Sequence, residues 1–136
     1  MRSDRLARAF ETERVYEDGE LIVAEGDDGH EMFVIRDGEV VISRRNGRRE
    51  HVLATLGRGE MFGEMSLLES RPREADARAR GRVTLLVLGP GALLVRLRRD
   101  PSFAVELLHH MSRRIRTLNE RLADAIRGDT ASGPEP

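Results

Sequence analysis

The residues best suited to chemistry in this chain are a glycine and glutamate pair and an arginine that follows it closely. Gly63 allows a ligand to approach the backbone, Glu64 can accept hydrogen bonds from a hydroxyl group, and Arg73 offers a planar fork that matches phosphate oxygens. Residues 64–69 can form one or two helical turns whose first amides would face the same anion. The segment therefore predicts a site for a sugar hydroxyl and an anion, with ribose phosphate as the first choice.

A second pattern lies upstream of this segment. Residues 22–38 read IVAEGDDGHEMFVIRDG, with a turn at Gly26 and Asp27 between two apolar runs and a closing glycine. Together with residues 62–79, which read FGEMSLLESRPREADARA, this pattern resembles the cyclic nucleotide-binding domain family, whose phosphate-binding cassette the later segment matches. The resemblance covers roughly residues 3–127 and rests on two motifs that occur in order at fitting separation.

The resemblance implies a role for each cassette residue. It assigns the ribose 2′-hydroxyl to Glu64 and the exocyclic oxygens of the cyclic phosphate to Arg73, whereas Gly63, Met65 and Ser66 would contribute backbone amides. The implied ligand is cAMP, with cGMP as second choice and no further cofactor. An isolated Glu or Arg is otherwise usually a solvated surface residue, and Ser66 can simply begin a helix. The complete predicted ligand-binding set is Phe62, Gly63, Glu64, Met65, Ser66, Arg73, Glu74 and Ala75.

Glu74 departs from the family pattern, which commonly has Ser, Thr, Ala or Gln after the phosphate-binding arginine. A carboxylate here would repel a cyclic phosphate by roughly 1 to 4 kcal/mol, depending on the effective dielectric. It could instead accept a hydrogen bond from the exocyclic amine of a guanine, which would favour cGMP. The third reading is that Glu74 turns outward and pairs with a nearby arginine. The sequence leaves these three readings open.

The composition favours a small binding module over most other classes. The chain has 136 residues and a formal net charge of −1, with opposite charges interspersed, so we expect one domain over residues 1–127 that binds neither nucleic acid nor membrane. All 23 basic residues are arginine, so arginine abundance alone does not indicate phosphate recognition. There is no cysteine, no long apolar stretch and no signal-peptide core, which predicts a cytoplasmic location. Residues 128–136 are expected to form a disordered tail.

Short apolar runs separated by turn signals predict the fold, a jelly-roll (double-stranded β-helix) barrel that is mainly β with flanking helices. A short N-terminal helix is expected at residues 3–10, and the helical cassette interrupts the barrel. Asn46 and Gly47 form the sharpest hairpin signal. The predicted strands occupy residues 15–16, 21–24, 32–35, 40–43, 51–56 and 83–88, and the predicted turns occupy residues 17–19, 26–27, 36–38, 46–47 and 56–59.

After the barrel the periodicity changes to that of helices. Residues 92–98 predict a short helix, and a longer one is expected from 102 to about 127. Its apolar seam either packs back on the barrel or forms a parallel homodimer. The seam consists of Leu108, Met111, Ile115, Leu118, Leu122 and Ala125. The helix would also cover the pocket mouth, with Ile115, Leu118 and Asn119 as candidates to cap the base, whereas the alternative and commoner reading of Asn119 is a solvated helix residue.

Catalytic alternatives find little support. The four histidines do not provide the strand-paired ligands of a metal-dependent barrel enzyme, and no serine elbow or cysteine nucleophile exists, so we predict neither an enzyme nor a metal site. The sequence thus indicates a cyclic nucleotide sensor that signals through movement of its C-terminal helices to an unknown downstream effector. The competing hypothesis is an adaptor that retains the barrel, binds no nucleotide and dimerises through its last helix.

Overall fold

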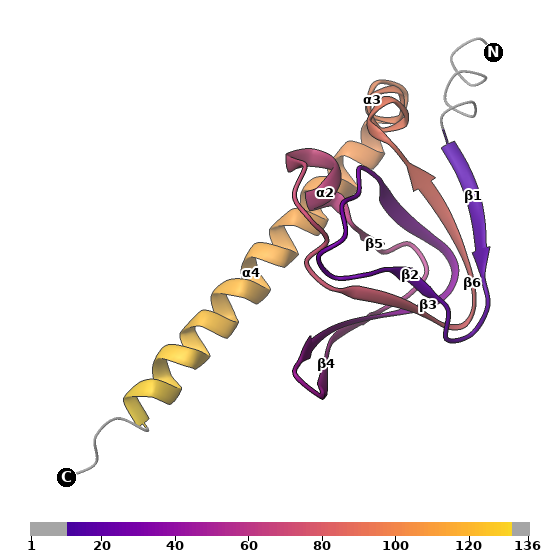
Figure 1. Cartoon of the computed structure of the whole chain (residues 1–136). Coiled ribbons are helices and arrows are strands. Elements are labelled where there is room, and N and C mark those ends of the chain that lie inside the picture. Colours follow the sequence, from indigo (N-terminus) through magenta and orange to yellow (C-terminus); the bar gives the residue numbers. More distant parts are fainter. Residues whose placement is uncertain (1–10, 132–136) are drawn as a thin grey trace. The chain divides into compact units, whose positions relative to one another are not determined.

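The computed structural model describes residues 11–131, with side chains to residue 128. Their elements, in chain order, are β1 (Glu11–Tyr16), β2 (Leu21–Val23), β3 (Met32–Asn46), β4 (Arg49–Leu56), β5 (Met61–Phe62), α2 (Glu64–Glu69), β6 (Asp76–Leu88), α3 (Pro90–Arg99) and α4 (Pro101–Ala131) (Figure 1). The predicted helix at residues 3–10 lies outside the described residues. The described chain forms two compact units that meet between Arg99 and Asp100, and each is considered by itself.

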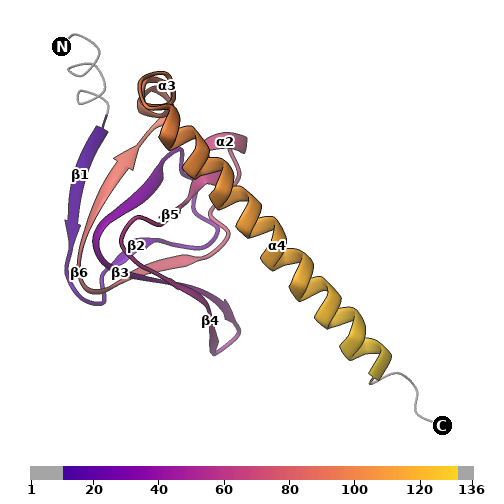
Figure 2. The same cartoon turned by 180° about the vertical axis from the view of Figure 1, so that it is seen from behind.

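The first unit is an antiparallel sheet in the order β1-β6-β3-β4, with β2 added to β6 and β5 added to β3. β6 is central because it pairs with β1, β2 and β3 along its length. The strands curl around a common interior, and α2 interrupts them between β5 and β6 (Figures 1 and 2). The prediction of a mainly β jelly roll with a helical cassette is confirmed.

One predicted turn is wrong. Residues 36–38 were expected to separate two strands, but β3 runs continuously from Met32 to Asn46. Instead of a turn, the pairing of β3 with β6 shifts register on both sides of Asp37. Gly38 has φ 89°, and a Cβ there would lie 2.4 Å from the carbonyl oxygen of Arg82. The glycine therefore supports a bulge that bends a long strand. In the sequence, the pattern of such a bulge closely resembles that of a turn.

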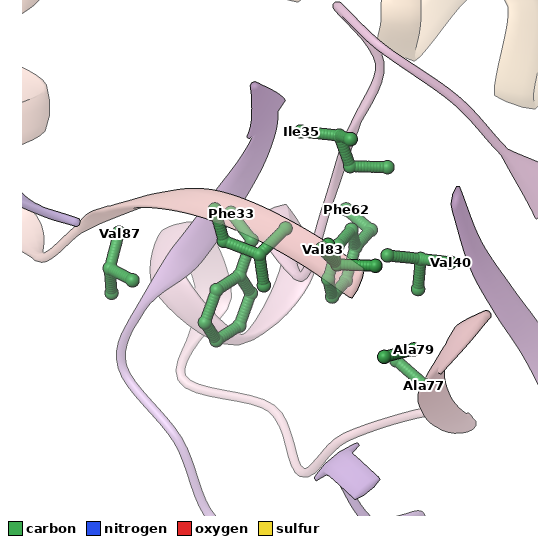
Figure 3. Packing of buried hydrophobic residues seen from close by; sticks show 9 residues of the cluster. Phe33, Ile35, Val40, Phe62, Ala77, Ala79, Val83 and Val87 are labelled. Atoms are coloured by element: carbon green, nitrogen blue, oxygen red, sulfur yellow. The ribbon is translucent and has the colours of Figure 1, made fainter. Parts of the chain in front are cut away.

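The interior of the first unit is filled by alternate residues of β3 and β6 (Figure 3). The rings of Phe33 and Phe62 stack with centroids 4.9 Å apart, and both side chains are buried. β6 contributes Val83, Leu85 and Val87 to the same cluster. Phe33 lies directly after the loop that joins β2 to β3, and Phe62 directly before the cassette. The core therefore fixes both segments that the sequence analysis singled out.

The hairpin predicted at Asn46 and Gly47 is confirmed. Asn46 pairs with Arg49, so Gly47 and Arg48 form a two-residue connection between β3 and β4, and Gly47 has φ 69°. β3 also pairs with β6, whereas β4 pairs only with β3 among the described residues. β4 is therefore an edge strand of the described sheet.

The second unit consists of α4. Asp100 caps this helix, since the amide of Phe103 donates to both the carbonyl and the carboxylate of Asp100. The helix continues to Ala131, so it includes four residues of the stretch from 128 that was expected to be tail. No helix in the described part of the chain is long and apolar enough to cross a membrane.

Candidate functional site

The cassette begins where β5 ends. Gly63 adopts φ 82° and ψ 6°, a left-handed conformation that turns the chain directly from the strand into α2. The helix ends at Glu69, and the C-cap residue Ser70 is also left-handed with φ 53°. Glu64 is 1 % exposed and Ser66 is 3 % exposed, so the predicted polar residues of this short helix lie inside the unit. A buried carboxylate needs polar partners, and Glu64 is not without a partner in the structure.

Arg73 is a buried arginine whose position is fixed from two sides. Its Nη1 donates to the carbonyl oxygen of Glu31 at 2.8 Å and to that of Gly63 at 3.3 Å. Its guanidinium carbon lies 5.4 Å from the centroid of the Phe33 ring. These contacts use one terminal nitrogen and one face of the guanidinium. They hold the fork in one orientation beside the start of α2, as anion recognition requires.

Two glycines make room for this arginine. A Cβ at Gly29 would lie 2.4 Å from Nη2 of Arg73 and 2.6 Å from its guanidinium carbon. A Cβ at Gly63 would lie 2.8 Å from Nη1. Any other residue at either position would push the guanidinium away. Both glycines lie within the two sequence motifs, but the motifs do not predict that Gly29 packs against Arg73.

The backbone around Arg73 is tied to the β2–β3 loop. The amide of Gly26 donates to the carbonyl of Arg73, and the amide of Arg73 donates to the carbonyl of Asp27, both at 2.8 Å. These two bonds hold the turn at Gly26 and Asp27 against the backbone of Arg73. The two motifs that the sequence analysis found far apart in the chain are therefore one structural site.

Burial lowers the pKa of the Arg73 guanidinium from its ordinary value, and the nearby Glu31 carboxylate opposes that shift. That carboxylate is itself held by Arg14, whose Nη2 lies 3.2 Å from Glu31 Oε2. Within residues 11–131, no carboxylate forms an ion pair with Arg73. An arginine stays protonated in spite of such a shift, so the site presents a positive charge balanced mainly by carbonyl dipoles.

The residues after Arg73 are partly buried. Arg44 of β3 donates from Nε to the carbonyl of Glu74 at 2.7 Å, and Asp76 accepts from the amide of Glu25 at 2.7 Å through Oδ1. Glu74 and Ala75 are therefore held beside the sheet by their neighbours. The three readings of the Glu74 side chain stay predictions.

The other predicted residues fall into three places. The Phe62 side chain belongs to the core, so only its backbone is available to a ligand. Met65 is half-buried in α2. Ile115, Leu118 and Asn119 lie on α4 in the second unit, and their role at the base stays a prediction. Among residues 11–131, no group of three or more His, Asp or Glu side chains is arranged to hold a metal ion.

Known proteins resemble both the sequence and the fold. Residues 13–100 match the family model described as "Cyclic nucleotide-binding domain". The chain is 38 % identical over 112 residues to the cyclic AMP receptor protein of Thermus thermophilus, covering 82 % of this chain and 52 % of that protein. It is 34 % identical over 109 residues to the CRP-like cAMP-activated global transcriptional regulator of Mycobacterium tuberculosis, covering 79 % of this chain and 49 % of that protein.

A solved structure, the catabolite activator protein of Thermus thermophilus, superposes with a TM-score of 0.77 at 36 % identity and covers 90 % of this chain and 58 % of that one. The chain spans about half the length of the curated relatives it matches. The family match covers the sheet, the cassette and Arg73, which are the parts that form the site described above. This chain belongs to the cyclic nucleotide-binding domain family.

Proposed function

We propose that this chain is a regulatory module that binds cAMP, with cGMP as the second choice, and that it is not an enzyme. The observation that carries this proposal is the buried Arg73, which two carbonyls hold in place and no described carboxylate neutralises. A cyclic phosphate would supply the missing negative charge. The names of the two similar proteins, a cyclic AMP receptor protein and a cAMP-activated regulator, favour cAMP over other cyclic phosphates.

The proposed binding mode follows from the chemistry of the cassette. The guanidinium of Arg73 binds the exocyclic phosphate oxygens, and the amides at the start of α2 add hydrogen bonds to the same group. Glu64 accepts a hydrogen bond from the ribose 2′-hydroxyl through its buried carboxylate. Because Gly63 carries no side chain, the guanidinium of Arg73 can lie beside the start of α2, where the phosphate would be bound by both.

The signal is proposed to leave the site through the cassette. Phosphate binding would draw α2 inward and change the packing of Leu67 and Leu68, of which Leu68 is 48 % exposed. The C-terminal helices would then move. The ligand must bind one arrangement more tightly than the other for this to occur. Chemical shifts of α3 and α4 that stay constant on saturation with cAMP would contradict this relay.

The test of binding is calorimetric titration of nucleotide-stripped protein with cAMP and with cGMP. Arg73→Ala should lose about 2 to 5 kcal/mol of binding free energy, since a charge pair shielded from water is removed. Arg45→Ala, which removes an exposed arginine of β3, is the matched control and should bind as the wild type does. A folded wild-type sample that gives no heat with either nucleotide would exclude the proposal.

Base preference is tested separately at Glu74. If its carboxylate accepts from guanine, Glu74→Ala should lower cGMP affinity and leave cAMP affinity unchanged. If it repels the phosphate, the same variant should bind both nucleotides more tightly. Equal affinities for wild type and variant would assign the side chain to a surface pair.

A second candidate function is an adaptor that dimerises through α4 without nucleotide. It is favoured by the exposed seam of this helix, where Leu108, Ile115, Leu118 and Leu122 are each more than half exposed. The occupant would be the same seam of a second copy. Sedimentation of wild type and a Leu118→Glu variant, each with and without cAMP, decides this point. A dimer that is lost in the variant and indifferent to cAMP would support the adaptor.

A further inference from the structure

The hairpin that joins β3 and β4 carries a concentration of positive charge that the proposed nucleotide site does not use. The arginines lie at four of the six positions from 44 to 49, and all four are exposed. They contrast with the whole chain, whose net charge is −1. The hairpin projects away from the remaining strands in both views (Figures 1 and 2).

Three of these arginines have no polar partner. Arg45, Arg48 and Arg49 form no side-chain hydrogen bond or ion pair with any residue in the described range, although Glu50 lies directly across the ladder from Arg45. The fourth, Arg44, donates to the carbonyl of Glu74. Like charges this close repel each other, which an anionic partner would relieve.

The same hairpin has an unpaired strand edge. Among the described residues β4 pairs only with β3, and residues 49–52 of β4 are exposed. Val52 is 61 % exposed on this stretch. An exposed edge next to an apolar side chain is a template for an added strand, since its outward amides and carbonyls lack partners in a sheet.

We propose that the outer edge of β4 binds an extended acidic peptide segment of a partner protein. The segment adds as a strand along the exposed residues 49–52, places an apolar side chain against Val52 and sets its carboxylates against Arg45, Arg48 and Arg49. Arginine forks bind carboxylates in a bidentate manner, which supplies register as well as attraction. The edge favours a polypeptide over a nucleic acid, because a phosphodiester chain cannot continue the ladder of backbone hydrogen bonds.

This surface is distinct from the nucleotide site, yet a bond connects the two. Arg44 ties the base of the charged hairpin to the residue that follows Arg73. The proposal does not depend on nucleotide binding, so it can be tested on the full chain without cAMP. If the chain fails to bind cAMP, the peptide result is unaffected. If it fails to bind the peptide, the cAMP result is unaffected.

The probe is a peptide of about ten alternating valine and glutamate residues with fluorescein on its N-terminus, long enough to span β4. Binding is followed by fluorescence anisotropy at low salt and by amide spectra of the isotope-labelled chain. We expect binding that weakens as salt is added, with protection from hydrogen exchange at alternate amides of residues 49–52. The matching valine and lysine peptide should not bind.

The decisive variant changes Arg45, Arg48 and Arg49 together to Gln and should weaken binding of the acidic peptide about tenfold or more. Its control changes Arg36, Arg58 and Arg80 to Gln, three exposed arginines elsewhere in the first unit, so the change in net charge is identical. The control should bind like the wild type, and amide spectra establish that both variants are folded.

Three results would overturn the proposal. The first is no binding of the acidic peptide by folded wild-type protein at about 1 mM, the weak limit for a specific contact. The second is an equal loss of peptide affinity in the hairpin variant and in its control. The third is a single-stranded oligonucleotide that binds the hairpin more tightly than the peptide, with no protection along β4, which would assign a nucleic-acid partner instead.

Discussion

Arg73 and the arginines of the β3–β4 hairpin are the same residue type in opposite settings. Arg73 is buried, lies over the Phe33 ring and has two carbonyl partners. Arg45 and Arg48 are exposed and have no polar partner within the described residues. Because the chain contains no lysine, residue type alone could not separate a binding arginine from a surface arginine.

The difference shows how one side chain serves two kinds of recognition. The surroundings of Arg73 fix its rotamer before a ligand arrives, so little conformational entropy is lost on binding. Water and salt screen the hairpin arginines, and their long side chains move freely. Arg73 therefore suits a single small anion at a defined position. The hairpin suits several carboxylates spread along a flexible partner.

The largest effect is expected when the aromatic ring that faces the Arg73 guanidinium is removed. Phe33→Ala deletes a fully buried ring that stacks on Phe62 and faces the Arg73 guanidinium. We expect the free energy of unfolding to fall by about 3 to 5 kcal/mol, as for other buried aromatic truncations. Chemical denaturation measures this value. Val52→Ala on the exposed edge of the hairpin should change it by less than about 0.5 kcal/mol.

The next largest effect is expected when the fork is replaced but the charge is kept. Arg73→Lys retains a cation and loses the planar fork, which donates to the Glu31 carbonyl and is proposed to bind the phosphate. Affinity for cAMP should fall about tenfold to a hundredfold, because a point charge cannot bind two oxygens in parallel. Arg45→Lys is the matched change on the hairpin and should leave calorimetric affinity unaltered. An Arg73→Lys variant that binds like the wild type would show that charge alone is recognised.

A smaller effect is expected when space for the guanidinium is removed. Gly29→Ala places a methyl group 2.4 Å from Arg73 Nη2. Gly29 does not have positive φ, so the backbone tolerates the change and the flexible arginine must move instead. We expect cAMP to bind roughly tenfold more weakly, as for a misplaced charge-assisted bond, with little change in unfolding midpoint.

Gly57→Ala is the control for that substitution, because no atom lies within 4 Å of a Cβ there and φ is not positive. It should alter neither affinity nor stability. If both alanine variants weaken cAMP binding equally, the space that Gly29 leaves for the Arg73 guanidinium is not the cause. If Gly29→Ala lowers the unfolding midpoint as strongly as it lowers affinity, the glycine acts mainly on the fold.

Sequence reasoning predicted the jelly roll and the cassette because their signals are local. The Gly63 turn, the α2 helix and the Asn46-Gly47 hairpin each depend on a few adjacent residues. The long strands were harder. β3 passes through Gly38 with a bulge, and β6 begins with charged residues such as Asp76 and Arg78, so neither shows an uninterrupted apolar pattern.

The surroundings of Arg73 could not be predicted from periodicity. Its partner Glu31 lies 42 positions away and contributes only a backbone carbonyl, which carries no sequence signal. Gly29 was visible as part of a motif, but its contact with Arg73 depends on the fold. The general lesson is that a motif names the residue that binds, whereas tertiary packing decides which atoms hold it ready.

The smallest effect is expected at the ion pair beside the site. Arg14 and Glu31 lie 3.2 Å apart with side chains 43 % and 37 % exposed, so the pair itself stabilises the fold very little. Its influence on the ligand is different, because the Glu31 carboxylate acts on Arg73 and would repel a phosphate. Arg14→Ala removes the cation that offsets this carboxylate. We expect about threefold weaker cAMP binding by calorimetry, which corresponds to roughly 0.6 to 0.7 kcal/mol.

A double variant separates electrostatics from structure at this pair. Adding Glu31→Gln to Arg14→Ala removes the uncompensated carboxylate while retaining the backbone carbonyl that holds Arg73, so affinity should return to the wild-type value. Arg82→Ala breaks a comparable exposed pair with Glu17, at 3.6 Å, and should have no effect. A double variant as weak as Arg14→Ala alone would mean that Arg14 acts by shaping β1, and the charge of Glu31 would then have no part in tuning the buried arginine.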